Sequence, residues 1–326
     1  MPRWIFLSLL LILASGCGPT DAPVDAADAS DVAPPERYDA DRAMGYLRRL
    51  CEFGPRPTGS EAMTAQRDYL AAFFRRGGGE VREQRFEIRH PRTGDPVPVV
   101  NLIASWGVDR PNRYLLCAHY DTRPYPDQDR NDPRGVFIGA NDGASGTATL
   151  MELSHQFATL PDDVGVDVVL FDAEELVYGP DDDYFIGSTY FAQDYLCRLP
   201  PVPYAAGILL DMVGDADLRL FYERNSLRLA PEVTRGLWRT ASDLGVREFV
   251  ARPRHEIRDD HLPLNRIAGI PTVDVIDFDY PHPGHRESYW HTVEDTPEKC
   301  SGRSLAKVVW VVDEYLRRQS RLPTAD

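Results

Sequence analysis

The segment from Val166 to Glu175 constrains the fold more than any other, because a largely apolar run ends directly in carboxylates. Val166 to Phe171 has the pattern of a buried strand in a parallel sheet, and Glu174 and Glu175 follow it closely. Carboxylates are costly to bury unless they bind a metal ion or are well paired. Because open α/β sheets place their sites at the carboxyl ends of strands, we expect both glutamates to reach one crevice there. One could hold a metal ion while the other moves a proton; the alternative is a solvated start of a loop.

The rest of the chain alternates between strand and helix patterns. Strands are predicted, from apolar or alternating runs, at 81–89, 98–105, 113–118, 166–171, 205–212 and 272–276. Helices are predicted, from periodicity and end signals, at 39–53, 61–76, 144–160, 187–196, 231–244 and 301–318. This alternation predicts an α/β fold with a mostly parallel sheet covered by helices on both sides. No internal repeat or second linker is visible, so residues 38–326 are predicted to form a single domain.

The N-terminus is not predicted to belong to this domain. Arg3 supplies a positive charge, Trp4 to Ala14 is almost wholly apolar, and small residues precede Cys17. The apolar run is shorter than the roughly 20 residues of a transmembrane helix but suits a signal peptide. Small residues before a cysteine resemble a bacterial lipoprotein signal, although Ala14 stands where leucine is usual. The resemblance implies a signal peptide at 1–16 and a lipidated Cys17 that anchors an exported protein to a bacterial cell membrane, facing the periplasm or the cell surface. Ordinary secretion and a cytosolic location are the alternatives.

A disordered tether is predicted between this signal and the domain. Residues 17–37 are rich in Ala, Asp and Pro and contain no aromatic residue. Such a segment cannot bury enough apolar surface to offset its chain entropy. The only expected contact with a membrane is therefore the lipid anchor.

The charge of the chain argues against one class of partner. Asp and Glu number 51 against 36 Lys and Arg, which gives a formal net charge of −15. Nucleic-acid binding requires clustered Lys and Arg that neutralise phosphates, so no nucleic-acid partner is expected. The acidic balance could attract a cationic group of a substrate, although solubility alone also explains it.

Four cysteines follow Cys17, namely Cys51, Cys117, Cys197 and Cys300. An oxidising compartment permits disulfides, but their pairing is left open. Cys117 lies in an apolar strand pattern and is predicted to be a buried thiol. Because the chain has no Cys-x-x-Cys spacing, a zinc ion held by thiolates is not expected.

Other predicted strand ends and loops also carry acids or histidines. His119 and Asp121 follow the strand at 113–118, Asp211 ends the strand at 205–212, and Asp142 stands in a glycine-rich loop before a helix. His291 lies in a late Trp-His-Thr segment. Each alone could be a cap or a core histidine. Together, neutral imidazole and carboxylates are the ligands that zinc prefers, so the sequence predicts a zinc site.

The order of these motifs resembles the clan that holds zinc aminopeptidases and glutaminyl-peptide cyclotransferases. The motifs are His-x-Asp, Asn-Asp-Gly-Ala-Ser-Gly, Glu-Glu, Leu-Asp, Asp-Asp-His and Trp-His-Thr, and the resemblance runs from Phe53-Gly54-Pro55-Arg56 to the last helix. It implies a three-layer α/β/α sandwich with a mixed, mostly parallel central sheet. It also implies a zinc-dependent enzyme that acts on the N-terminal segments of peptides or exported proteins.

The two branches of the clan imply different uses of the same residues. The aminopeptidase pattern implies two zinc ions with five ligands, at His119, Asp211, Asp142, Glu175 and His291. Asp121 would then orient His119, and Glu174 would be the general base. The cyclotransferase pattern implies a single zinc ion with three ligands, at Asp142, Glu175 and His291. There the catalytic proton relay would be formed by Glu174, Asp211 and Asp259, with Trp290 and Asp260 at the substrate.

Two features favour the cyclotransferase branch. Asp259-Asp260-His261 doubles the aspartate where aminopeptidases usually have a small hydroxyl residue first, and Trp290 directly precedes the ligand histidine. The loop 179–184, with its Asp181-Asp182-Asp183 run, departs from the pattern; these acids are either solvated or attract the amine of a substrate. We therefore expect conversion of N-terminal glutamine to pyroglutamate with release of ammonia. The alternatives are a two-zinc aminopeptidase and, from another class, a surface-anchored binding protein on a degenerate enzyme scaffold.

Overall fold

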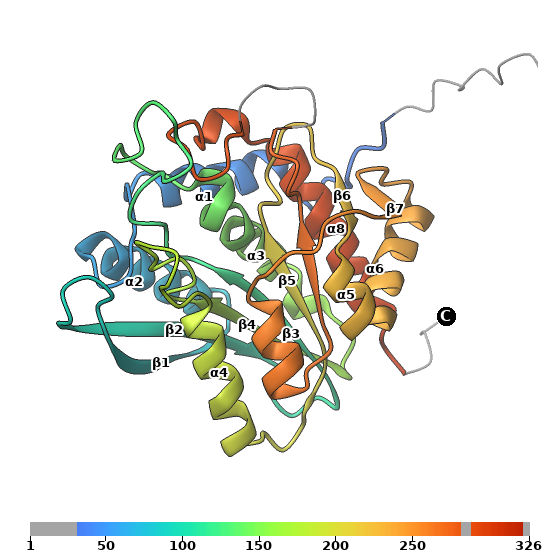
Figure 1. The fold of residues 1–326 in the computed structure, drawn as a ribbon. Coiled ribbons are helices and arrows are strands. Elements are labelled where there is room, and N and C mark those ends of the chain that lie inside the picture. Colours follow the sequence, from blue (N-terminus) through green and yellow to red (C-terminus); the bar gives the residue numbers. More distant parts are fainter. Residues whose placement is uncertain (1–30, 282–287, 322–326) are drawn as a thin grey trace, which may run out of the picture. The chain divides into compact units, whose positions relative to one another are not determined.

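The computed structural model describes residues 31–281 and 288–321, and its helices and strands lie in the unit that begins at Val32. A six-stranded sheet forms the centre of this unit (Figure 1). In spatial order the strands are β1 (Glu80–Arg89), β2 (Pro96–Trp106), β4 (Val164–Phe171), β3 (Asn112–His119), β5 (Tyr204–Asp211) and β8 (Thr272–Ile276). The β1–β2 and β2–β4 pairs are antiparallel, whereas β4, β3, β5 and β8 run parallel to one another. The predicted α/β fold with a mixed, mostly parallel sheet is confirmed.

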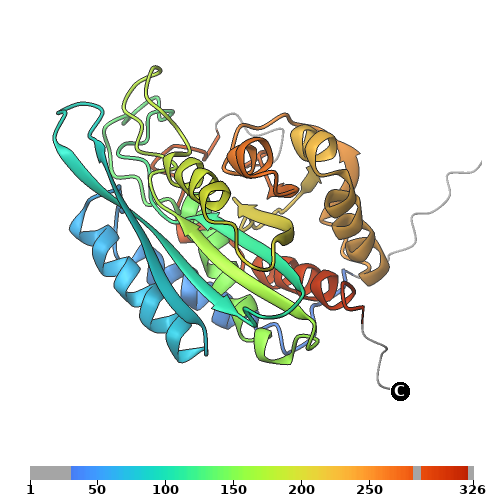
Figure 2. The ribbon, with the colours of Figure 1, turned by 90° about the horizontal axis from the view of Figure 1, so that it is seen from below.

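Helices cover both faces of the sheet (Figure 2). One face carries α1 (Ala40–Cys51), α2 (Glu61–Arg76), α3 (Gly146–Ser154) and α8 (Gly302–Arg317), with α6 (Pro231–Leu244) packed beside α8. The other face carries α4 (Ile186–Cys197) and the helical segment made of α7 (His261–Pro263) and η3 (Leu264–Ala268). Every residue of β3 and β4 is buried, as expected of strands covered on both faces.

The register of the central strands assigns alternate residues to the two cores. Leu116 of β3 lies opposite Val168 and Ile208, and all three pack in the core with α1, α3 and α8. Cys117 lies opposite Val169 and packs in the core with α4. This alternation follows from the two-residue period of a strand and explains why both faces of the segment read as apolar. Cys117 is fully buried, as predicted, and all four cysteines of the described residues are free.

Two parts of the secondary structure differ from the sequence prediction. The helix predicted at 144–160 ends at Ser154, where the side-chain hydroxyl bonds to the Met151 carbonyl and competes with the helical hydrogen bonds. A short turn, η2 (Phe157–Thr159), replaces its last part. The elements absent from the prediction are short: β6 (Leu220–Tyr222), α5 (Arg224–Leu229), β7 (Phe249–Pro253), the α7–η3 segment and η4 (Pro297–Lys299). Runs of three to six residues show too little periodicity to be found this way.

No helix within the described ranges is both long and apolar enough to cross a membrane. The predicted signal peptide, the lipidation of Cys17 and most of the tether fall in residues 1–30, outside the described residues.

Candidate active site

The carboxyl ends of β3, β4 and β5 bring the predicted polar residues to one edge of the sheet. His119 is the last residue of β3 and Asp211 the last of β5, while Glu174 and Glu175 follow β4 within four residues. Because the three strands are parallel neighbours, their ends meet. The sequence pattern at 166–175 predicted a site at the carboxyl end of this strand. The structure gathers these side chains at that edge of the sheet.

The backbone is strained around this edge. Ala173, Phe185, Met212 and His291 are the described residues other than glycine with positive φ, at 57°, 59°, 48° and 56°. Phe185, Met212 and His291 line the same cavity, and Ala173 directly precedes Glu174. Left-handed backbone costs of the order of 1 kcal/mol at such residues and is concentrated at functional sites. The turn at Ala173 is what carries two consecutive glutamates toward one cavity.

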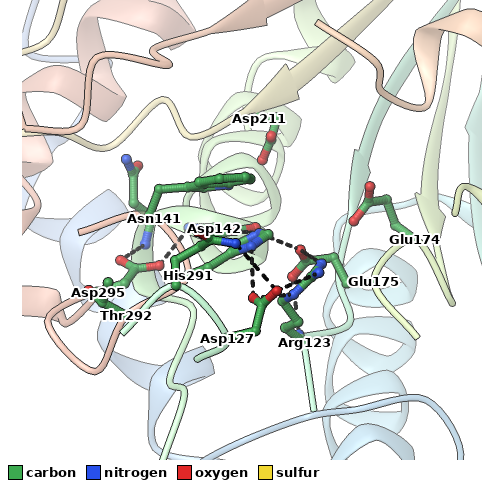
Figure 3. Close-up of polar contacts among 12 residues, drawn as sticks. Arg123, Asp127, Asn141, Asp142, Glu174, Glu175, Asp211, His291, Thr292 and Asp295 are labelled. Atoms are coloured by element: carbon green, nitrogen blue, oxygen red, sulfur yellow. Dashed lines mark hydrogen bonds and ion pairs between the residues drawn. The ribbon is translucent and has the colours of Figure 1, made fainter. Parts of the chain in front are cut away.

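One histidine and two acids form the first candidate ligand group. The Nε2 atom of His291 is 2.8 Å from Oε1 of Glu175 and 3.4 Å from Oδ2 of Asp142 (Figure 3). The Nδ1 atom of the same ring lies 3.2 Å from Oδ1 of Asp127. A carboxylate on the second ring nitrogen is the usual partner of a metal-bound histidine, since it fixes the orientation of the ring.

A second histidine approaches Asp142 from its other oxygen. The Nε2 atom of His119 is 3.1 Å from Oδ1 of Asp142 and 3.2 Å from Oδ1 of Asp211. Asp142 therefore lies between the two histidines, with one carboxylate oxygen toward each. The resemblance to aminopeptidases named Asp142 among the five ligands of two zinc ions.

The loop that carries Asp142 is fixed by close backbone contacts. Gly143, with φ 94°, leaves no room for a side chain, because a Cβ atom there would lie 2.7 Å from the Asp121 carbonyl oxygen. The backbone N–H groups of Asn141 and Asp142 donate to the Asp295 carboxylate, at 2.8 and 3.1 Å (Figure 3). Arg56 is fully buried and donates to the carbonyls of Gly54, Ile138 and Gly139, just before this loop.

The donor atoms fit a zinc ion. The five candidate ligands are all buried, with exposures of 9% or less: His119, Asp142, Glu175, Asp211 and His291. Oδ2 of Asp142 and Nδ1 of His119 have no hydrogen-bond partner among the described residues, and His119, Asp142 and Glu175 each offer a ligand atom within 4.8 Å of the others. Clustered buried carboxylates require a cation, and nitrogen with oxygen ligands suits zinc.

Glu174 lies beside this group without joining its hydrogen bonds (Figure 3). Its Oε2 atom is 3.9 Å from Nδ1 of His119, and its backbone N–H donates to Asp121, as does that of Glu175. Burial and the charge of Glu175 raise the pKa of Glu174 well above its usual value. A cation held by Glu175 would offset the second effect. The resemblance implied that Asp121 orients His119. Asp121 also holds the backbone turn that carries Glu174 and Glu175, because it accepts both of their N–H groups.

A cavity of about 370 Å³ opens over these residues. Asp211 and Asp259 line it together with Glu174, and its walls include the apolar side chains of Ile257 and Phe278. Burial and the charges of Asp211 and Asp260 raise the pKa of Asp259 well above its usual value. Three acids outside the first ligand group therefore share one small chamber.

Of the two predicted substrate-binding residues, Trp290 lines the cavity and Asp260 does not. The indole of Trp290 stacks on the His291 ring with centroids 3.8 Å apart, meets Phe278 edge-on and lines the cavity. Asp260 is fully buried at the start of α7 and is not among the described residues that line the cavity. Asp260 directly precedes α7, so its side chain and that of Asp259 lie on different sides of the chain. Asp260 was predicted to contact the substrate, but it lies behind the residues that line the cavity.

The sequence did not indicate three further residues of the site. Arg123 donates to Glu175 from both its backbone and its side chain, at 3.1 and 3.2 Å, and its guanidinium also reaches Asp127. Asp127 and Asp295 support His291 and the Asp142 loop, as described above. The available signal was proximity in the chain, because Arg123 and Asp127 follow the His119–Asp121 motif and Asp295 follows His291.

Comparisons with known proteins found a family model and several solved structures that are similar to this chain. The model of peptidase family M28 matches residues 101–316. The crystal structure of a Fimbriiglobus ruber glutaminyl cyclase is similar with a TM-score of 0.81 and 40% identity, covering 87% of this chain and 96% of that one. A Zn-dependent exopeptidase from Parabacteroides distasonis is similar with a TM-score of 0.78 and 32% identity, covering 86% and 99%. Aminopeptidase YwaD of Bacillus subtilis is 26% identical over 237 residues, which are 69% of this chain and 46% of that protein. The chain spans less than half the length of the curated relatives that it matches.

Proposed function

The chain belongs to peptidase family M28, and we propose that within this family of zinc-dependent enzymes it acts as a glutaminyl-peptide cyclotransferase. The observation that carries the proposal is Asp259, an acid that lines the cavity with Glu174 and Asp211 and whose pKa is raised by burial and by neighbouring charges. Hydrolysis at a metal centre requires one acid–base group beside the ligands, whereas cyclisation moves a proton from an amine to a leaving nitrogen. A chamber with several acids that exchange protons suits the second task. The similarity to a glutaminyl cyclase across most of both chains supports the same reading.

The proposed reaction joins two groups of the same residue. The α-amine of an N-terminal glutamine attacks the carbon of its own γ-carboxamide, one C–N bond forms, and ammonia leaves without consumption of water. Glu174 takes the proton of the amine and delivers it to the departing nitrogen, and Asp259 shares this proton transfer. The apolar walls at Trp290, Phe278 and Ile257 exclude water that would compete with the amine.

Zinc fits the ligand group formed by Asp142, Glu175 and His291 and would supply Lewis-acid polarisation of the γ-carbonyl oxygen. Asp127 orients His291 for this purpose, and Arg123 holds Glu175. In this proposal His119 and Asp211 bond to each other rather than to a second ion, as their separation of 3.2 Å permits.

A two-zinc aminopeptidase is the second candidate, and a specific observation favours it. His119, Asp142 and Asp211 approach one another as closely as the first ligand group does, so a second ion has its ligands in place. Glu174 would then activate water for attack on a peptide carbonyl. Similarity to an exopeptidase and to an aminopeptidase supports this alternative.

One experiment separates the two candidates. Purified protein is incubated with Gln-initiated and Leu-initiated peptides, ammonia and peptide mass are measured, and zinc per chain is determined by elemental analysis. We expect Gln-initiated peptides to lose one ammonia with every peptide bond intact, and zinc near one per chain. Trimming of Leu-initiated peptides by an enzyme with two zinc ions that ignores glutamine would show the aminopeptidase to be correct.

We also propose that the protein is exported and held at a bacterial membrane by a lipid on Cys17, where N-terminal segments of peptides or exported proteins reach it. The apolar run followed by small residues and a cysteine motivates this location. Replacement of Cys17 by alanine should move the protein from the membrane fraction to the soluble fraction, as checked by fractionation and immunoblotting. A Cys17→Ala protein that still sediments with membranes would contradict lipid anchoring.

A further inference from the structure

A second cavity of about 720 Å³ adjoins the first. Tyr184 lines both cavities, and its hydroxyl accepts a hydrogen bond of 3.1 Å from the Arg123 guanidinium. The same guanidinium donates to Glu175 in the first cavity. A peptide whose first residue lies over Glu174 and Glu175 would therefore pass Tyr184 and enter the second cavity with its following residues.

Two arginines stacked on two tyrosines form one side of this second cavity. The guanidinium of Arg92 lies 5.4 Å from the ring centre of Tyr178, and that of Arg134 lies 4.9 Å from the ring centre of Tyr125. The two rings meet edge-to-face with centroids 6.1 Å apart. The four side chains come from the β1–β2 connection, the loop after β3 and the loop after β4. Stacking on aromatic faces orders each guanidinium without using its N–H donors.

The charges around this cavity leave these two arginines without a carboxylate. Arg92 and Arg134 form no ion pair with the described part of the chain, whereas Arg123 is matched by Glu175 and Asp127. Asp182 also lines the cavity, but its Oδ2 accepts the backbone N–H groups of Tyr178 and Gly179, at 2.8 and 2.9 Å. Two exposed arginines with no carboxylate partner among the described residues therefore line the second cavity, in a chain whose formal net charge is −15.

We propose that the second cavity is a subsite for a carboxylate carried by the substrate beyond its N-terminal residue, bound by Arg92 and Arg134. The inference rests on the proposed function in one respect, namely that a peptide N-terminus occupies the first cavity. Guanidinium groups bind carboxylates through two parallel hydrogen bonds, and the aromatic stacking orients them for such contact. The carboxylate is either an Asp or Glu side chain or the C-terminus of a short peptide.

The test compares peptides that differ only in one carboxylate. Amidated peptides begin with Gln and carry either Glu or its neutral isostere Gln at the second, third or fourth position, and a Gln-initiated tripeptide is used as free acid and as amide. Because exposed ion pairs contribute about 0.2–1 kcal/mol each, two arginines should give the acidic peptide a roughly 2- to 30-fold higher kcat/KM, through a lower KM. The ratio compared is kcat/KM of the acidic peptide divided by that of its neutral counterpart. The peptide position with the largest ratio shows which side-chain carboxylate binds, and a ratio above one only for the free-acid tripeptide shows that the C-terminal carboxylate binds. The preference should weaken as salt is added.

Matched variants connect this preference to the arginines. In the Arg92→Gln/Arg134→Gln protein the ratio should fall to about one. Arg252, whose guanidinium lies 5.3 Å from the Phe221 ring and which lines neither cavity, is the control, and Arg252→Gln should retain the ratio. A wild-type ratio of one at every position, or a ratio that survives the double substitution, would overturn the proposal.

A binding measurement keeps this result independent of the reaction. Affinities of the same peptides, labelled at the C-terminus, are measured by fluorescence anisotropy with the Glu174→Gln protein; the free-acid tripeptide is used unlabelled as a competitor. Preference for the acidic peptide in this assay, together with no ammonia release by the wild-type protein, would support the subsite while contradicting the cyclotransferase. Ammonia release by the wild-type protein without such preference in binding would support the cyclotransferase and overturn the subsite.

Discussion

Replacement of Glu174 by glutamine should lower ammonia release by at least about 100-fold while the zinc content stays unchanged, because acid–base catalysis contributes this much or more. Glu174 lies in the cavity and makes none of the short contacts that hold His291. The amide keeps the size of the side chain but cannot take up the proton of the substrate amine. Rates and zinc per chain, measured on the same preparation, check this prediction.

The neighbouring residue gives the matched control. Glu175 lies 2.8 Å from His291 and accepts two hydrogen bonds from Arg123, so Glu175→Gln should lose most of its zinc as well as its activity. Thermal unfolding of both variants separates loss of function from loss of fold. If Glu174→Gln lost zinc and Glu175→Gln kept it, the roles of the two glutamates would have to be exchanged.

The apolar pattern of the sequence was sufficient to find the sheet and one edge of the site. Val166 to Phe171 is buried on both faces, and its carboxyl end leads into Glu174 and Glu175, because parallel strands covered by helices have no solvated face. His119 and Asp211 could be placed at the same edge by the same reasoning. These predictions depend only on parallel strand direction, which the alternation of strand and helix patterns along the chain indicated.

The supporting residues could not be found in this way. Asp127, Arg123 and Asp295 lie in loops, and their contacts with His291, Glu175 and the Asp142 backbone depend on how distant loops pack. Asp259 and Asp260 show the same difficulty at closer range. They are adjacent acids, yet Asp259 lines the cavity and Asp260 does not. The reason is that Asp260 is the residue directly before α7, where the chain turns into the helix. Chain order gives no information on that difference.

The loop that carries Asp259 is held from outside the cavity. Glu223, which caps α5, accepts the backbone N–H of Ile257 at 2.9 Å, and Asn225 donates to the Ile257 carbonyl at 2.7 Å. The position of the backbone near Asp259 therefore depends in part on contacts that do not involve the Asp259 side chain. That side chain also accepts the backbone N–H of Asp260 at 2.5 Å, and serine or asparagine at this position keeps an oxygen that can accept the same N–H.

Substitution of Asp259 by serine should suppress ammonia release by about 100-fold, the scale of a lost acid–base group, with zinc and fold retained. The reason is that Asp259 lines the cavity, has a raised pKa and is not one of the three ligands proposed for zinc. Asp259→Asn, which preserves the shape but cannot exchange a proton, should behave in the same way. Ammonia release, zinc content and thermal unfolding are the measurements.

Asp260 provides the control with the same chemistry one residue away. Burial raises the pKa of Asp260 to about 7, but Asp260 does not line the cavity as Asp259 does, so Asp260→Asn should reduce the rate far less than Asp259→Asn. The comparison also decides between the two enzymes, since hydrolysis by a metal-activated water needs Glu174 but no further acid at position 259. Full ammonia release by Asp259→Asn would remove Asp259 from the proton relay. If peptide trimming instead proceeded equally well in the wild-type, Asp259→Ser and Asp259→Asn proteins, the additional acid would have no part in the chemistry, and the two-zinc aminopeptidase would account for the site.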